Sequence, residues 1–228
     1  MALPQRTILF VSNSFSCNLQ KPSDGNMGEL LLETLTRRVR VLSIAQIADL
    51  LGDAAGDAAQ ALAAALEAKG FIERRAVLAR PALRCSAPLV NWRPGDEPPE
   101  FGKVAYRLKS RWREPVEPIE IVQASRLAAR RCGGALGGRW PRASETTHDV
   151  SLAEVFLWHQ THRPDDAACW VPEAQLYAEG WGLRGRLPDA VIRRGGKDVR
   201  IVEFGGSYGK QKLAAFHAEM QPLPYEIW

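Results

Sequence analysis

The stretch LPDAVIRRGGKDVRIVEFGGSYGKQKLAAFH, residues 187–217, decides the fold of the C-terminal half. It opens with a short apolar run over 187–192 and returns, after a polar turn with two glycines, as an alternating apolar and polar run over 199–204. Two glycines in a short connection supply the positive φ angles that a tight hairpin requires. From Lys210 onward the apolar residues recur at helical spacing. The stretch therefore predicts strand, tight turn, strand and helix.

Two carboxylates lie on these adjacent predicted strands. Asp189 follows Pro188 in the first run, and Glu203 lies near the end of the second. Carboxylate oxygens are the ligands that divalent cations such as Mg²⁺ prefer. The pair is therefore a candidate metal site. In the alternative interpretation Asp189 only shapes a turn, and Glu203 pairs with Arg200 or Lys212 without any metal.

Composition limits the class of protein. The 228 residues are 46% hydrophobic and 25% charged, which suits one large or two small globular domains. The four cysteines have no C-x-x-C spacing, which argues against a zinc knuckle and against a disulfide framework.

No apolar run approaches the roughly 20 residues of a membrane span. We expect a cytoplasmic protein with no membrane partner. We expect no nucleotide cofactor either, because the glycines after Glu203 lack phosphate-loop spacing.

Positive charge is concentrated in the middle of the chain. Residues 103–142 contain ten Lys or Arg against three Glu, although the net charge of the whole chain is only +4. A basic segment between less basic flanks is typical of a surface that contacts a phosphate backbone. The alternative is a solvated surface with no partner.

The N-terminal half predicts two consecutive helices followed by a strand. A serine at 43 and a glutamine three residues later form a capping box that begins the first helix, which ends at Gly52. Asp57 can cap the second helix, Gly70 follows as its C-terminal stop, and residues 71–75 are expected to form a strand. Helix, turn, helix and strand is the order of a winged helix. The wing is expected from the chain that leaves at Ala79 and returns at 89–92.

A winged helix would place its second helix in the major groove of duplex DNA. That helix offers only one residue suited to reading base edges, so we expect phosphate contacts from basic residues outside it. The expected DNA-contacting residues are Gln60, Lys69, Arg74, Arg75, Arg80, Arg84, Arg107, Arg111, Arg126 and Arg130. The alternative use of a winged helix is homodimerisation.

The Pro188-Asp189 pair, the hairpin and Glu203-x-Gly205 resemble the PD-(D/E)xK signature of the restriction-endonuclease-like superfamily. Gly205 stands where active members carry the lysine that positions and activates the attacking water. Together with the N-terminal half, residues 26–228 resemble the plasmid replication-relaxation proteins. Those proteins join a winged helix to a degenerate nuclease-like domain.

The resemblance implies further site residues. An early helix supplies a third acidic ligand in the nuclease-like family, and Glu154 is the candidate, although Ser151 and Glu154 also have the spacing of a capping box. A lysine relocated to the following helix would be Lys210 or Lys212. On this interpretation the catalytic residues are Asp189, Glu203 and one of these lysines, with Mg²⁺ as the metal. With a degenerate site the protein needs no cofactor.

We therefore predict an α/β fold in four parts: an arm over 1–25, a winged helix-turn-helix over 26–98, a basic helical connector over 99–140, and a nuclease-like mixed sheet flanked by helices over 141–228. The preferred function is binding of double-stranded DNA without efficient cleavage. The implied setting is the replication, transfer or transcriptional control of a plasmid or integrated mobile element. The alternatives are a metal-dependent DNA endonuclease and a protein-interaction module.

Overall fold

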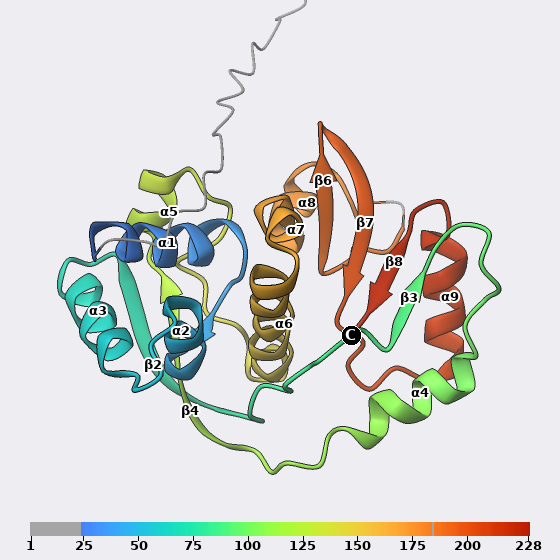
Figure 1. The fold of residues 1–228 in the computed structure, drawn as a ribbon, viewed down its shortest axis with the longest axis horizontal. Helices are drawn as coiled ribbons and strands as arrows, with labels where there is room; N and C mark the ends of the chain where they lie inside the picture. The colour runs from blue at the N-terminus through green and yellow to red at the C-terminus, as the bar shows by residue number, and fades with distance from the viewer. Residues whose placement is uncertain (1–23, 184) are drawn as a thin grey trace, which may run out of the picture.

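The computed structural model describes residues 24–183 and 185–228, so that nearly all of the expected arm lies outside the described residues. The chain is mixed α/β, as predicted, with 45% of its residues in helices and 19% in strands. Two sheets lie on either side of the long helix α6 (Ala143–His162), as Figure 1 shows. None of the helices in the described ranges has the length and apolarity needed to cross a membrane.

The first group of elements is a three-stranded antiparallel sheet with four helices. The strands, in the order β1-β4-β2, are β1 (Leu42–Ser43), β4 (Glu117–Ala124) and β2 (Ile72–Ala79). The helices are α1 (Asp24–Arg37), α2 (Ile44–Leu51), α3 (Asp57–Ala68) and α5 (Arg126–Cys132).

Local sequence signals define the helix pair α2 and α3. The capping box at the start of α2 is confirmed, because the Ser43 hydroxyl accepts from Gln46 N at 3.2 Å and Gln46 Oε1 accepts from Ser43 N at 3.0 Å. Gly52 ends α2 in the left-handed conformation with φ 68°. The predicted cap at Asp57 is wrong by one residue, because Gly56 is the N-cap of α3 and Asp57 is its first helical residue.

The prediction that residues 89–92 form the second strand of the wing is wrong. Residues 90–92 form β3, which pairs with β8 of the other sheet, and the partner of β2 is β4, from Ile72 opposite Ala124 to Ala79 opposite Glu117. The interpretation failed because strand partners are chosen by tertiary packing rather than by sequence distance. Residues 80–116 leave the first group, add β3 and α4 to the second, and return.

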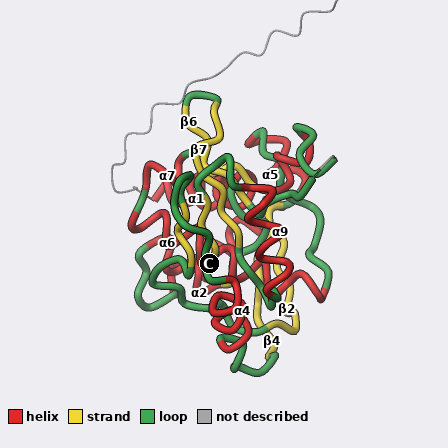
Figure 2. Tube along the Cα trace, turned by 90° about the vertical axis from the view of Figure 1, so that its right-hand side faces the viewer, coloured by secondary structure: helices red, strands yellow, loops and turns green. Residues whose placement is uncertain are grey.

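The second group is a five-stranded sheet covered on both faces. Its strands, in the order β3-β8-β7-β6-β5, are β3 (Val90–Trp92), β8 (Tyr225–Ile227), β7 (Lys197–Glu203), β6 (Ala190–Arg194) and β5 (Trp170–Pro172), and only β7 and β8 run parallel. The helices α4 (Phe101–Ser110) and α9 (Lys210–Met220) cover one face, and α6 covers the other (Figures 1 and 2). The short helices α7 (Pro164–Ala168) and α8 (Glu173–Ala178) flank β5.

Alternating residues of β7 point to the two faces of this sheet. Ile201 packs in one core cluster with Leu108 of α4 and Leu213 of α9, whereas Val202 packs in another with Phe156 of α6. The predicted hairpin between β6 and β7 is confirmed, with a two-glycine turn whose φ angles are 56° and 76°.

One hydrophobic core joins the two groups. It contains Ile47 of α2 together with Phe156 of α6 and Trp170 of β5. Reciprocal hydrogen bonds close the junction: Trp170 Nε1 donates to Arg38 O at 3.1 Å, and Arg38 Nη1 donates to Trp170 O at 2.6 Å. The expected connector 99–140 holds α4, β4 and α5, which lie in different groups.

Candidate functional site

The hairpin brings the two predicted carboxylates together. Asp189 immediately precedes β6, and Glu203 is the last residue of β7, one register step beyond the pair Ala190 and Val202. The backbone N–H of Asp189 lies 3.4 Å from Glu203 Oε2. The sequence therefore predicted this pair correctly as neighbours.

Both carboxylates are engaged by groups of the chain itself. Glu203 is 3% exposed, and its Oε1 accepts a hydrogen bond from the Tyr208 hydroxyl at 2.6 Å. Asp189 Oδ2 accepts from the Phe204 N–H at 2.6 Å, and His148 Nε2 lies 3.2 Å from the same carboxylate. With these partners, the oxygens of buried Glu203 and half-buried Asp189 are satisfied without a metal ion.

His148 on α6 supplies positive charge at this site. Burial lowers its pKa, but Asp189 and Asp149 together raise the pKa to about 11, so the imidazole is protonated at neutral pH. Its Nδ1 lies 3.4 Å from Asp149 Oδ1. The imidazolium thus occupies the electrostatic role that a cation would have beside Asp189.

Sequence reasoning missed His148 and the hydrogen bond of Tyr208. The helix that carries Glu154 begins at Ala143, well before the alternative cap at Ser151, so that His148 lies inside it. The polar run Thr146 to Asp149 was the available signal, because a helix that continues through polar residues often carries a functional or buried polar face. No sequence signal connects Tyr208 to Glu203.

Burial, followed by the charge of Asp189, raises the pKa of Glu203 to about 8, against the opposing effects of Tyr208 and His148. The folded state therefore holds a proton on Glu203 over pH 4.5 to 8, where the unfolded state has lost it. A folded-state pKa above the unfolded value means that stability falls as pH rises through this window. The raised pKa of His148 has the same effect at higher pH, so that stability also falls as the pH rises from 6.5 to about 11.

A Glu203→Gln variant tests this titration. The amide keeps the shape of the side chain and cannot ionise, so its unfolding free energy should lose less between pH 5 and 8 than that of the wild type. Urea unfolding across that range measures both proteins. Parallel pH profiles would show that Glu203 ionises normally in the folded protein.

Only one of the two candidate lysines contacts a residue that binds the carboxylates. Lys212 Nζ lies 3.4 Å from the ring centroid of Tyr208, whose hydroxyl binds Glu203. Burial lowers the pKa of Lys212, and Glu203 and Asp189 oppose that shift. Lys210 is exposed and makes no side-chain hydrogen bond or ion pair within the described part of the chain.

The position of the missing lysine is filled. A Cβ atom at Gly205 would lie 2.8 Å from Leu108 Cδ2 and 2.9 Å from Ile227 Cγ2, distances that real Cβ atoms essentially never show. Helix α4 and strand β8 therefore close this side of the site. A side chain at residue 205 has no room without movement of its neighbours.

The expected third metal ligand is elsewhere, which corrects the prediction. Glu154 accepts from Gln46 Nε2 at 3.2 Å and faces α2 rather than the carboxylate pair. The alternative capping box at Ser151 is not formed either, because α6 begins earlier, at Ala143. Across the described ranges no three His, Cys, Asp or Glu side chains are grouped so that they could hold a metal ion.

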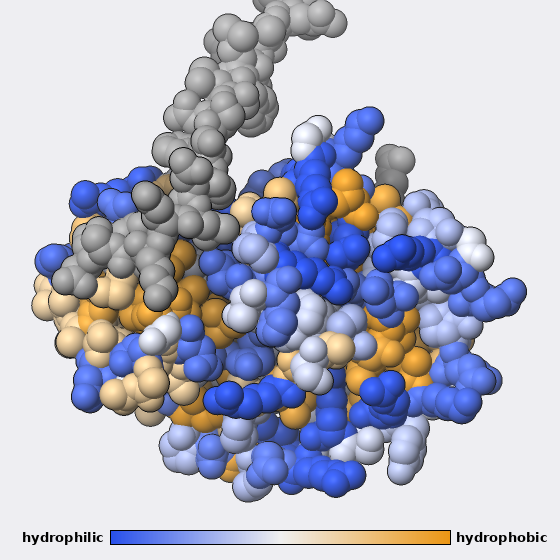
Figure 3. Space-filling model, in the orientation of Figure 1, coloured by the Kyte–Doolittle hydropathy of each residue, from blue (hydrophilic) through white to orange (hydrophobic). Residues whose placement is uncertain are grey.

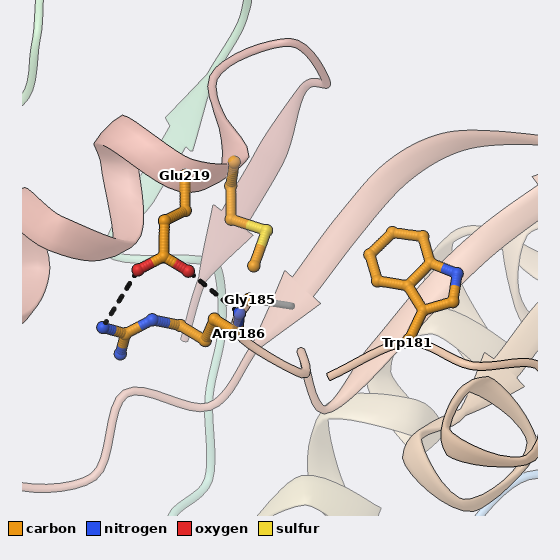
Figure 4. A pocket seen from close by; sticks show the side chains of 5 residues that line it. Trp181, Gly185, Arg186 and Glu219 are labelled. Carbon is orange, nitrogen blue, oxygen red and sulfur yellow. Dashed lines mark hydrogen bonds and ion pairs between the residues drawn. The ribbon is translucent and has the colours of Figure 1, made fainter. Parts of the chain in front are cut away.

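Two hollows lie near the carboxylates. Asp189 lines a crevice of about 30 Å³ with Arg38, Arg40 and Glu173, which is the liquid volume of about one water molecule. An open groove of about 620 Å³ lies beside α9, between Trp181 on one side and the Glu219–Arg186 pair on the other (Figure 4). Neither hollow exposes Glu203.

Several residues that were predicted to contact DNA instead bind other residues of the protein. Arg74 donates to Gln60 Oε1 at 2.9 Å and pairs with Glu120 at 2.8 Å. Arg80 binds the carbonyl of Glu114 through its guanidinium. Arg111 lies 4.4 Å from the ring centroid of Phe204, and burial lowers its pKa to about 10. Among the basic predicted contacts, those with exposed side chains are Lys69, Arg75, Arg84, Arg107, Arg126 and Arg130.

The basic middle of the sequence does not form one patch. Arg107 lies on α4, whereas Arg126 and Arg130 lie on α5, and the two helices are at opposite ends of the protein in Figures 1 and 2.

Comparisons with protein-family models, with curated proteins and with solved structures give no match. The functional interpretation therefore rests on residues and geometry.

Proposed function

We propose that this chain binds double-stranded DNA and does not cleave it efficiently. The observation that carries the proposal is the closed carboxylate pair. Asp189 and Glu203 are held by Phe204 N, His148 and Tyr208, and Leu108 fills the space beside Gly205. Metal-assisted phosphodiester cleavage needs ligand oxygens open to a cation and a base beside the water.

The arrangement of elements supports the nucleic-acid part of the proposal. The first group has the helix, helix and strand order of a winged helix-turn-helix, with β2 and β4 as the antiparallel ribbon. The second group is a mixed sheet flanked by helices with two carboxylates at adjacent strand ends, which suits a degenerate restriction-endonuclease-like domain. By the replication-relaxation resemblance, the protein would serve a plasmid or integrated mobile element in replication, transfer or transcriptional control.

Salt dependence of duplex binding tests the proposal. If about five phosphates are contacted, affinity should fall roughly 500-fold between about 50 and 200 mM salt. Fluorescence anisotropy with a labelled duplex of mixed sequence measures this slope. A flat salt profile, or no binding at 50 mM salt, would leave the protein-interaction module as the better interpretation.

One observation favours the endonuclease as a second candidate. Lys212 lies against Tyr208 at the carboxylate pair, where a relocated base would be needed. An active enzyme would lose Mg²⁺-dependent or Mn²⁺-dependent cleavage in Lys212→Met and Asp189→Ala and keep it in Lys210→Met. Because Lys210 and Lys212 lie on the same helix, the pair is a matched comparison.

A further inference from the structure

The segment of helix α5 and its flanks carries uncompensated positive charge. Residues 124–142 contain five Arg and no Asp or Glu, whereas residues 93–117 around α4 contain six Lys or Arg and five Asp or Glu. The two halves of the basic middle therefore differ sharply in net charge. Of these two segments, only residues 124–142 have a strongly positive net charge.

Hydrogen bonds bring together the chain segments that carry these cations. The Ser125 hydroxyl accepts from Ala128 N at 3.2 Å and donates to Gly70 O at 2.7 Å, which places the end of α3 beside the start of α5. Gly138 N donates to Ala124 O at 2.8 Å, so the chain after α5 returns to its beginning. We call the resulting set of exposed cations the α5 face: Lys69, Arg126, Arg130, Arg131 and Arg139.

Among the described residues, no carboxylate forms an ion pair with the α5 face. Its five cations are absent from the ion pairs formed within residues 24–183 and 185–228, whereas Arg40, Arg193 and Arg200 elsewhere each pair with at least two acids. Residues 1–23 contain no Asp or Glu. Uncompensated like charges at short separation repel one another, and an anionic partner relieves that repulsion.

Helix α3, the expected reading helix, lacks such charge. Its exposed side chains include Asp57 and Glu67 and several alanines, with Gln60 already bound to Arg74. The surface over α3 accordingly appears pale orange at the left of Figure 3. Phosphate contact by α3 would bring two carboxylates toward the DNA backbone, which costs affinity.

We propose that the α5 face is the surface that binds the phosphate backbone of duplex DNA. The inference rests on the proposed function and adds the place of contact. Four of its five cations are arginines, whose planar guanidinium groups match phosphate oxygens in bidentate geometry. Its one exposed large apolar side chain is Leu127, which is 45% exposed, too little apolar surface for insertion into a lipid bilayer.

Matched charge reversals test the inference. Arg126→Glu with Arg130→Glu alters the α5 face, and Lys103→Glu with Lys109→Glu alters α4 by the same charge, with all four side chains exposed. The α5 variant should lose at least tenfold in affinity for a mixed-sequence duplex and lower the salt slope by about two. The α4 variant should stay within about threefold of the wild type. Circular dichroism and thermal unfolding confirm that both variants are folded.

The outcomes separate this inference from the proposed function. If the α5 variant keeps wild-type affinity, or if the α4 variant loses as much affinity as the α5 variant, the α5 face is not the DNA-binding surface. The proposal that the protein binds DNA would still stand. A wild type that binds no duplex overturns both. Tighter binding to vesicles of anionic lipid than to duplex DNA at the same salt also overturns the inference, because the face would then serve a membrane.

Discussion

A Gly205→Lys variant is expected to gain no nuclease activity and to lose about 1–3 kcal/mol or more of unfolding free energy. The new Cβ would lie 2.8 Å from Leu108 Cδ2 and 2.9 Å from Ile227 Cγ2, so these packed side chains must shift. Burying an ammonium group among Leu108 and its neighbours adds a further cost. A lysine at this position, as in the nuclease-like family that the sequence resembles, is therefore expected to damage the site rather than complete it. Urea unfolding and a plasmid cleavage assay measure the two effects.

Gly209→Ala is the matched control for this variant. Gly209 lies at the start of α9 with φ −84° and has nothing within 4 Å of an added Cβ. Its replacement should change stability by less than about 0.5 kcal/mol. Metal-dependent cleavage by the Gly205→Lys protein at wild-type stability would show that the space beside Leu108 is available to a side chain.

Truncation of Trp170 should have the largest effect on stability. A Trp170→Ala variant is expected to lose about 3–5 kcal/mol, as large aromatic truncations in cores do. Trp170 is 1% exposed, packs edge to face on Phe156 with ring centroids 5.5 Å apart, and exchanges two hydrogen bonds with Arg38. The loss should appear in a single unfolding transition, because one core joins the two groups.

Trp181→Ala provides the comparison. Trp181 is only half-buried at the rim of the groove beside α9, so its loss should cost clearly less than that of Trp170. Two separate transitions in the Trp170→Ala protein would contradict the shared core. They would show that the sheets unfold independently.

The sequence predicted the parts of the fold that local rules determine. The two glycines between β6 and β7 and the Ser43 capping box each satisfy backbone requirements within a few residues. The partners of β2 and β3 could not be predicted in this way. Pro118 interrupts the strand pattern of β4, and it lies at the exposed end of that strand, opposite Leu78, where it is tolerated.

The sequence predicted the two carboxylates of the site but not the residues that hydrogen-bond to them. Asp189 and Glu203 follow from the hairpin, because adjacent strands bring their ends together. His148 and Tyr208 come from separate elements, and Glu154 faces α2, an orientation that the packing of α6 decides. Among the arginines, sequence cannot separate exposed Arg126 from engaged Arg74 or buried Arg111, since only the fold decides which of them meets an acid or a ring.

The central claim is that this protein binds duplex DNA and leaves it intact, and one incubation tests both parts. Purified protein is mixed with supercoiled plasmid in Mg²⁺ or Mn²⁺ at about 50 mM salt. Half of the sample is run as a mobility shift and half is run after removal of the protein. We predict a retarded complex and only supercoiled DNA after deproteinisation. Nicked or linear plasmid that requires metal and disappears in Asp189→Ala, or the absence of any complex, would contradict the account.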